Sequence, residues 1–477
     1  MAESCGNPSS EQDALMLRRS KFDKSNICIK CKVNPGNVVI RHAVIASAEC
    51  FFPLVSSKFR RALVPAINPG PIPDTPRKKK GSLKAAGNLC IGFSGGLGSS
   101  VLLDLVTESY FPSENGNTKG GSDHPRHHEK VWDHGTVCYV EICSALPGTR
   151  DRTEEVRALV SEYRHFEFLP LRIEDAFDEA WWAKVGGRGL ESNMTVDLAD
   201  EDLILSQSTT SDNSVAALHS YISSLPTQTA VPSAIQTLIR LLLLHTARST
   251  GSSHLLLGTS LTSLSVSLIS SISQGGGFVV REEAQEEWQP TVESKRTVRV
   301  NRPLRDIGMK ECAMWAWWKG VHIPGKENYL GGKQGIGALT KNFIVGLERD
   351  YPSTVSTIAR TCGKLAPKDS SDSSCILCGR PAQPGKPDLA SPPPHLQNMT
   401  PQIPPVAPAS QSSLTPRLCY ACHTTLTSRS SRGSTASGNH INSTPLPVWV
   451  VSELDGVGHR KMGEKEMKES ISEYLLE

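Results

Sequence analysis

The residues of this chain that are best suited to chemistry lie at a turn made of one serine and two glycines. Ser94, Gly95 and Gly96 follow an apolar run at 89–93, and Ser99 lies where apolar residues begin to recur at helical spacing. A strand, a glycine turn and a helix in this order present backbone N–H groups and a helix N-terminus to an anion. Glycine allows a close backbone approach, and the serine hydroxyls add donors. The pattern therefore predicts a phosphate-binding loop.

The loop has no lysine, so it is not a Walker A sequence. Its Ser-Gly-Gly-x-x-Ser pattern is instead typical of the PP-loop of ATP pyrophosphatases. Active PP-loops usually carry an aspartate just before the last serine, where this chain has Gly98. The sequence thus predicts a phosphate cradle without its usual magnesium-handling residue, and an ordinary tight turn is the alternative for the loop alone.

Two complete Cys-x-x-Cys pairs near the C-terminus are the strongest chemical signal in the chain. Thiolates on two such knuckles are typical of tetrahedral structural zinc, and four protein ligands leave no open position for a substrate. The proline-rich stretch between the pairs adds little to the free-energy cost of bringing them together, because loop-closure entropy grows only logarithmically with loop length. The predicted zinc ligands are Cys375, Cys378, Cys419 and Cys422.

Three cysteines nearer the N-terminus predict a second, incomplete zinc site. Cys28 and Cys31 form a Cys-x-x-Cys pair, whereas Cys50 stands alone because Ser47 occupies the position of its partner. His42 is a candidate fourth ligand, although nothing in the spacing requires it. A remnant of a zinc ribbon with free cysteines is the alternative interpretation.

A run of basic residues lies just before the predicted phosphate loop. The formal net charge of +3 is too small to indicate a nucleic-acid partner by itself, but the basic residues are concentrated in this segment. A basic arm next to a phosphate loop suits RNA, and a solvated linker is the alternative. The predicted RNA-contacting residues are Arg77, Lys78, Lys79 and Lys80.

Composition predicts several modules joined by polar segments. Only 38% of the 477 residues are hydrophobic, and the chain holds 38 glycines and 32 prolines, which is typical of long unstructured inserts. We expect a disordered N-terminus at 1–24, a zinc-ribbon-like cysteine module at 25–64, a basic linker at 65–85, a PP-loop-like α/β domain with loop inserts at 86–365, a zinc-knuckle module with a proline-rich insert at 366–430, and a linker with a C-terminal segment at 431–477.

The lack of an apparent targeting signal, together with the spacing of the cysteines, predicts a soluble, cytoplasmic protein. The N-terminus lacks a positively charged start followed by an apolar core, so we expect no signal peptide. The longest apolar run, 238–244, is interrupted by Arg240 and is too short to span a bilayer. Nearly half of the 13 cysteines lie in Cys-x-x-Cys pairs, which indicates metal binding in a reducing compartment.

Alternating strand and helix patterns must position the phosphate loop. They predict a parallel, doubly wound α/β sheet, in which ligands lie beyond the carboxyl ends of the strands. The expected strands are 89–93, 136–142, 166–171, 253–258 and 298–304, with a last strand at 447–451. The expected helices are 153–163, 233–249, 259–269 and 307–318.

Taken together, these motifs closely resemble the cytoplasmic tRNA 2-thiolation protein 2 family. The resemblance covers the cysteine pairs, the loop at 92–96, the segments 257–260 and 302–305, and the knuckle at 375–381. It implies an adenine-nucleotide α-hydrolase type of α/β fold. It also implies a cytoplasmic role in 2-thiolation of the wobble uridine, as part of 5-methoxycarbonylmethyl-2-thiouridine synthesis, in the tRNAs for Lys, Glu and Gln.

The resemblance further implies a division of labour between subunits. Family members partner a catalytic PP-loop paralogue, and the sulfur comes from a thiocarboxylated ubiquitin-related modifier. In that chemistry ATP adenylates the uridine carbonyl oxygen, and a sulfur nucleophile then displaces AMP. Gly98 and the lack of a Cys-x-x-Cys pair in the α/β core depart from the catalytic relatives.

We therefore expect a required, non-catalytic subunit with structural zinc, and ATP binding is left open. The alternatives are a free-standing ATP-dependent adenylating or amidotransferase enzyme, and a zinc-knuckle RNA-binding scaffold with an inert core.

Overall fold

The computed structural model describes the greater part of the chain between residues 27 and 458. The described residues are 27–33, 36, 38–40, 43–45, 48–67, 87–111, 131–146, 148–190, 192–207, 213–288, 297–325, 335–365, 374–382, 413–427 and 443–458. The N-terminus expected to be disordered, His42, the basic residues 77–80 and most of the proline-rich insert lie outside these residues.

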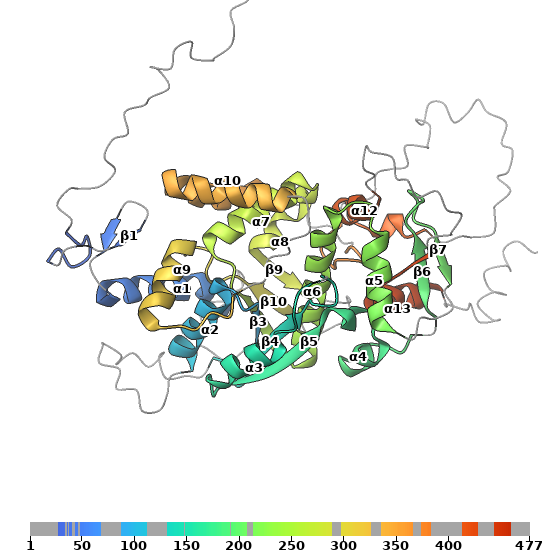
Figure 1. Cartoon of the computed structure of the whole chain (residues 1–477), viewed down its shortest axis with the longest axis horizontal. Helices are drawn as coiled ribbons and strands as arrows, with labels where there is room; N and C mark the ends of the chain where they lie inside the picture. Colours follow the sequence, from blue (N-terminus) through green and yellow to red (C-terminus); the bar gives the residue numbers. More distant parts are fainter. Residues whose placement is uncertain are drawn as a thin grey trace, which may run out of the picture.

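A six-stranded sheet in the order β5-β4-β3-β8-β10-β9 forms the centre of the molecule (Figure 1). The first five strands in this order are parallel, and β9 joins the edge antiparallel to β10. This arrangement confirms the predicted parallel α/β fold. The strands are β3 (Asn88–Phe93), β4 (Gly135–Glu141), β5 (Phe166–Arg172), β8 (Ser252–Leu257), β9 (Gln285–Trp288) and β10 (Val298–Asn301).

Both faces of the sheet are covered, as expected for parallel strands. Alternation along β3 divides its side chains between two cores, because Leu89 and Ile91 join one cluster and Cys90 joins the other. One core holds α1 (Ala48–Ile67), α2 (Leu97–Tyr110), α3 (Thr153–Ser161) and α9 (Met309–Lys319), and the other holds α6 (Ala230–Ser249).

α6 is long and apolar enough to cross a bilayer by length and composition, but most of it is buried inside the protein. Arg240 is part of this helix, and it forms an ion pair with a residue of the core rather than facing solvent. The helix is therefore a core element that covers one face of the sheet.

Four helices pack on one another beside the sheet, where α10 lies above α7 in Figure 1. They are α7 (Leu261–Ser273), α8 (Val280–Ala284), α10 (Ile336–Asp350) and α11 (Pro352–Leu365). A hairpin of β1 (Val38–Ile40) and β2 (Ala43–Ile45) precedes α1. Single 3-10 turns occupy Ile173–Phe177, Gly276–Val279 and Thr415–Arg417.

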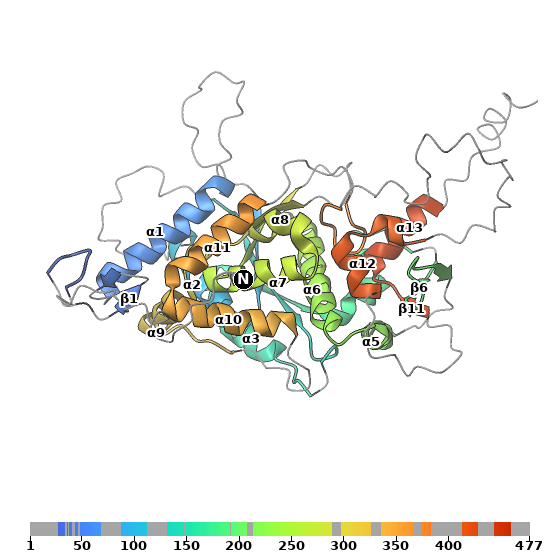
Figure 2. The ribbon, with the colours of Figure 1, turned by 90° about the horizontal axis from the view of Figure 1, so that it is seen from above.

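A smaller unit at the opposite end from β1 contains the C-terminal segments (Figure 2). Its antiparallel sheet has the order β11-β6-β7, which joins a strand near the end of the chain to two strands from the middle. Its elements are β6 (Met194–Asp197), β7 (Leu205–Gln207), β11 (Ser443–Pro445), α4 (Glu179–Lys184), α5 (Ser214–Ser224), α12 (Tyr420–Thr427) and α13 (Val448–Gly458).

The expected strand at 447–451 is wrong, because this apolar run begins α13. The Pro447 carbonyl accepts hydrogen bonds from the Val450 and Val451 N–H groups, as in a first helical turn. A short run of buried apolar residues has no period that separates a strand from a buried helix. Packing against the core decided between them here.

Candidate functional site

The predicted phosphate loop lies at the carboxyl end of the central strand β3. β3 ends at Phe93 and α2 begins at Leu97, so the glycine turn joins them directly. Gly95 has a φ of 72°, a conformation that favours glycine. The Ser99 hydroxyl donates to the Gly96 carbonyl at 2.8 Å, and its Oγ lies 3.3 Å from Ser94 Oγ. The structure therefore brings the four predicted loop residues together.

Gly98, which replaces the usual aspartate, packs directly against the backbone that follows β8. A β-carbon built on Gly98 would lie 2.0 Å from the Gly258 carbonyl oxygen. A β-carbon on Gly258 would lie 2.5 Å from the backbone nitrogen of Ser99. Neither position can hold a side chain unless the backbone moves. The role of Gly258 was not predicted, although a glycine at a strand end is a signal of close backbone approach.

A segment that follows α9 lies against the loop and is fixed by an arginine. The Gly325 N–H donates to the Gly95 carbonyl at 2.9 Å. The Arg152 guanidinium donates to the Gly325 carbonyl at 2.8 Å and to the Pro324 carbonyl at 2.5 Å. Glu155 pairs with Arg152 at 3.0 Å, and this contact lowers the pKa of Glu155. Arg152 thus ties α3 to the segment beside the loop, a role that no local pattern in the sequence indicates.

The carboxylate of Glu141, at the end of β4 beside β3, is fully used by the fold. Oε1 accepts the N–H groups of Ile142 and Cys143 at 2.8 and 2.9 Å. Oε2 accepts the N–H of Arg152 at 2.8 Å and the Tyr139 hydroxyl at 3.0 Å. Glu141 is also buried. It therefore stabilises the turn after β4 and is a poor substitute for the missing aspartate.

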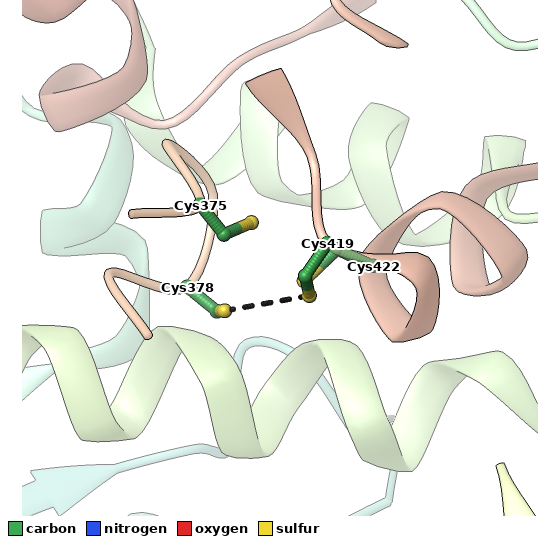
Figure 3. Close-up of side chains that lie close together, drawn as sticks. All are labelled: Cys375, Cys378, Cys419 and Cys422. Atoms are coloured by element: carbon green, nitrogen blue, oxygen red, sulfur yellow. Dashed lines mark hydrogen bonds between the residues drawn. The ribbon is translucent and has the colours of Figure 1, made fainter. Parts of the chain in front are cut away.

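The four C-terminal cysteines converge into one buried cluster (Figure 3). All four sulfur atoms lie within 4.8 Å of one another, and Cys378 Sγ lies 3.8 Å from Cys419 Sγ. A tetrahedron with metal–sulfur bonds of about 2.3 Å has edges of about 3.8 Å, so this donor set fits a tetrahedral metal ion. Interactions with the neighbouring thiols, Cys375 first, hold the pKa of Cys378 well below its usual value.

Buried ion pairs attach this cluster to the α/β core. Arg380, just after the first knuckle, pairs with Glu283 of α8, and Arg302, after β10, lies 3.8 Å from the same carboxylate. Burial alone would raise the pKa of Glu283, but Arg380 and Arg302 outweigh it and lower the pKa to about 2. Arg240 of α6 donates to the Cys378 carbonyl and pairs with Glu286 of β9. Arg302 and Arg380, which belong to two of the segments that resemble the family, therefore meet at one glutamate.

The three N-terminal cysteines also come together. The ligand atoms of Cys28, Cys31 and Cys50 lie within 4.8 Å of one another, and Cys50 is in the first turn of α1. Desolvation, and then the neighbouring thiols of Cys31 and Cys28, raise the pKa of Cys50. The next residues of α1 anchor the group, because Phe51 packs edge-on against Trp318 at a centroid distance of 5.0 Å. Three thiols could hold a metal with one position left, and no fourth ligand joins them among the described residues.

Several known proteins are similar to this chain in sequence. A family model described as cytoplasmic tRNA 2-thiolation protein 2 matches residues 335–424. The Danio rerio protein of that name is 35% identical over 174 residues, which cover 34% of this chain and 34% of that protein. The Bos taurus protein is 27% identical over 391 residues, or 74% of this chain and 71% of that protein. Cytoplasmic tRNA 2-thiolation protein 2-A of Xenopus laevis is 28% identical over 418 residues, which cover 78% of this chain and 76% of that protein.

Coverage differs among these relatives. The matches to the Danio rerio and Homo sapiens proteins span about a third of the length of those proteins. Among solved structures, the U34-tRNA thiolase NcsA from Methanococcus maripaludis with its 4Fe-4S cluster covers 75% of this chain and 92% of its own. The TM-score of that match is 0.47 and the sequence identity is 15%.

Proposed function

We propose that this chain, which belongs to the cytoplasmic tRNA 2-thiolation protein 2 family, is a required, non-catalytic subunit of a cytoplasmic tRNA 2-thiolation complex. In this proposal a catalytic PP-loop paralogue is its partner and tRNA its substrate. The sulfur comes from a thiocarboxylated ubiquitin-related modifier. The wobble uridine of the tRNAs for Lys, Glu and Gln is the acceptor.

The contact between Gly98 and Gly258 is the observation that supports a non-catalytic role for this subunit. Adenylation of a uridine oxygen needs an acidic residue to hold magnesium near the ATP phosphates. Backbone fills the place where the side chain of that residue would lie. The nearby carboxylate of Glu141 accepts four hydrogen bonds from its own surroundings. We therefore assign adenylation and sulfur transfer to the partner and a supporting role to this loop.

We propose that the four C-terminal cysteines hold structural zinc. Four thiolates satisfy a tetrahedral ion completely, so the site supplies stability rather than an open coordination position. Cys28, Cys31 and Cys50 would hold a second ion together with a ligand from outside this group. The ion at the C-terminal site would fix the knuckle that carries Arg380, and through Glu283 it would hold the small unit on the α/β core.

Thiolation of tRNA in cells that lack this gene tests the proposal. Mercury-affinity gels of the tRNAs for Lys, Glu and Gln report 2-thiouridine directly, and we expect the thiolated band to disappear in the deletion strain and to return with the wild-type gene. A Ser94→Ala, Ser99→Ala variant should also restore the band if the loop is structural. Cys143→Ser, in the turn after β4, is a matched control for expression.

Two outcomes would contradict the proposal. A normal thiolated band in the deletion strain would exclude a required role in tRNA thiolation. Release of pyrophosphate from ATP by the purified chain alone would instead favour the free-standing adenylating enzyme.

A further inference from the structure

An open cavity of about 440 Å³ lies away from the phosphate loop, where the starts of α6 and α12 meet the end of α7. Its wall carries hydroxyl and amide groups from all three helices and their ends, among them Thr229, Ser233, Gln274 and Thr425. None of the described residues that line it is charged. A wall of this kind can hydrogen-bond an uncharged polar ligand but cannot balance an ionised one.

Tyr420 forms an aromatic wall of this cavity and is 54% exposed. Its backbone lies between two of the clustered cysteines, Cys419 and Cys422, which restrict its position. A β-carbon on Gly275 would lie 2.5 Å from both Cδ1 and Cε1 of the ring and 3.8 Å from Cγ. Gly275 therefore contacts the edge of the ring rather than one of its faces.

We propose that this cavity binds one unstacked nucleotide of the RNA substrate, with its base stacked on Tyr420 and its polar groups bonded to the hydroxyl-rich wall. The inference rests on the proposed function, since it names a second contact between this chain and tRNA. Proteins recognise unpaired RNA bases by stacking them on aromatic rings and by hydrogen bonds to their edges and to the ribose. An acidic or basic peptide would require a charged side chain in the wall, and the wall has none within the part of the chain that the structure describes.

The cavity is within reach of the sheet edge at which the phosphate loop lies. α7 begins at Leu261, three residues after Gly258, and ends at Ser273 in the cavity wall. Its 13 residues span about 20 Å at 1.5 Å per residue. Figure 2 shows α7 running from the centre of the molecule toward α6, with α12 on the far side of α6. An RNA bound at the carboxyl edge of the sheet can therefore extend to Tyr420.

Binding of a fluorescein-labelled tRNA for Lys by the full-length protein tests the proposal. We expect Tyr420→Ala to weaken binding about 5- to 150-fold, the range of a lost base–aromatic stack. Tyr420→Phe should bind as the wild type does, because it keeps the ring. The salt dependence should stay unchanged, since the tyrosine neutralises no phosphate. Tyr351→Ala, at another exposed tyrosine that follows α10, should have no effect.

A second variant tests the cavity without altering the cysteine cluster. Thr229→Val removes one hydroxyl from the cavity without touching the knuckle, and we expect it to weaken binding about 2- to 10-fold. Metal content is measured for every variant. If Tyr420→Ala loses metal, the test rests on the tRNA affinity of Thr229→Val instead. Unchanged tRNA affinity in Thr229→Val then overturns the proposal.

The remaining outcomes separate this inference from the proposed function. Wild-type affinity in Tyr420→Ala with its metal retained overturns the nucleotide site and leaves the proposed function standing. Loss of a co-purifying protein with tRNA affinity unchanged also overturns it, because the cavity would then be a protein-docking site. If the wild-type protein does not bind tRNA at all, the nucleotide site is overturned, and the thiolation assay in the deletion strain decides the proposed function separately.

Discussion

Gly98 and Gly258 approach each other so closely that neither position has room for a side chain. A β-carbon on Gly98 would lie 2.0 Å from the Gly258 carbonyl oxygen, and one on Gly258 would lie 2.5 Å from the Gly98 carbonyl oxygen. The first glycine lies in the first turn of α2, and the second follows β8. The absence of the aspartate is therefore part of a packed backbone contact, rather than a single replaced side chain.

Gly98→Asp should destabilise the protein without creating an active loop. Forcing a side chain into this contact should lower the free energy of unfolding by about 1–3 kcal/mol, as overpacking does elsewhere. Gly337→Ala in α10 is the matched control, because a β-carbon there meets no atom within 4 Å. Denaturant unfolding measures the first effect, and pyrophosphate release from ATP measures the second. A stable Gly98→Asp protein that releases pyrophosphate would show that the aspartate can be accommodated.

Cys375→Ser should remove one metal ion per chain. Three remaining thiolates bind a tetrahedral ion less tightly, and the C-terminal cluster has no other ligand among the described residues. Elemental analysis of the purified protein measures the loss, and the ion released on thiol modification identifies zinc. Cys362→Ser, at a buried cysteine of α11 outside both clusters, should keep the full metal content. Unchanged metal content in Cys375→Ser would exclude this cluster as a metal site.

Arg380→Ala should release the cysteine knuckle from the core. It leaves the buried Glu283 carboxylate with the more distant Arg302 and the Ser267 hydroxyl, and breaking a buried ion pair costs about 3–5 kcal/mol. Hydrogen exchange across 374–382 reports the release. Pairing the change with Glu283→Gln should recover most of the stability, because the uncompensated charge is then gone. Arg417→Ala, in an exposed pair with Glu453, should cost about 1 kcal/mol or less.

His245 should make the small C-terminal unit sensitive to acid. Burial, and then the positive charges of Arg248 and Arg240, lower the pKa of His245 to about 3, and its ring lies 5.0 Å from those of Trp182 and Trp288. The unfolded chain takes up this proton near pH 6.5, whereas the folded protein does not. The stabilisation is therefore complete above pH 6.5 and is lost as the pH falls toward 3.

Denaturant unfolding followed by tryptophan fluorescence at pH 7.5 and 5.5 measures this effect. Each pH unit below 6.5 should remove about 1.4 kcal/mol from the free energy of unfolding through His245. His245→Phe should reduce the pH dependence by this amount, and His165→Gln, at an exposed histidine, should leave it unchanged. An identical pH dependence in wild type and His245→Phe would contradict the assignment.

Neutralising the basic segment should weaken tRNA binding in a salt-dependent way. Alanine at Arg77, Lys78, Lys79 and Lys80 should reduce the slope of log affinity against log salt by about 0.7–0.9 for each phosphate that is no longer neutralised. These residues lie outside the described part of the chain, so the experiment tests a proposal from charge pattern alone. Unchanged affinity and slope would show that the segment is a solvated linker.

Much of the architecture was predictable because it depends on local patterns. Buried parallel strands read as continuous apolar runs, and helices as apolar residues with a period near 3.6. Short windows of sequence therefore predicted the strands β3, β4, β5, β8 and β10 and the helices α3, α6, α7 and α9, but not the strands β6, β7 and β9 or the helices α5 and α8. The paired cysteines at 375–378 and 419–422 were recognisable for a similar reason, since their spacing matches one knuckle at a time.

Other features depend on contacts between residues far apart in the chain. The start of α13 was expected as a strand, because a short apolar run fits either structure until its packing partners are known. The Gly98–Gly258 contact, the meeting of Arg302 and Arg380 at Glu283, and the Tyr420 cavity each join segments separated by long stretches of sequence. The types and spacing of residues within a short segment do not show which distant segments will come into contact. They arise when the sheet order and helix packing bring the backbones together, and they determine which predicted residues remain available for chemistry.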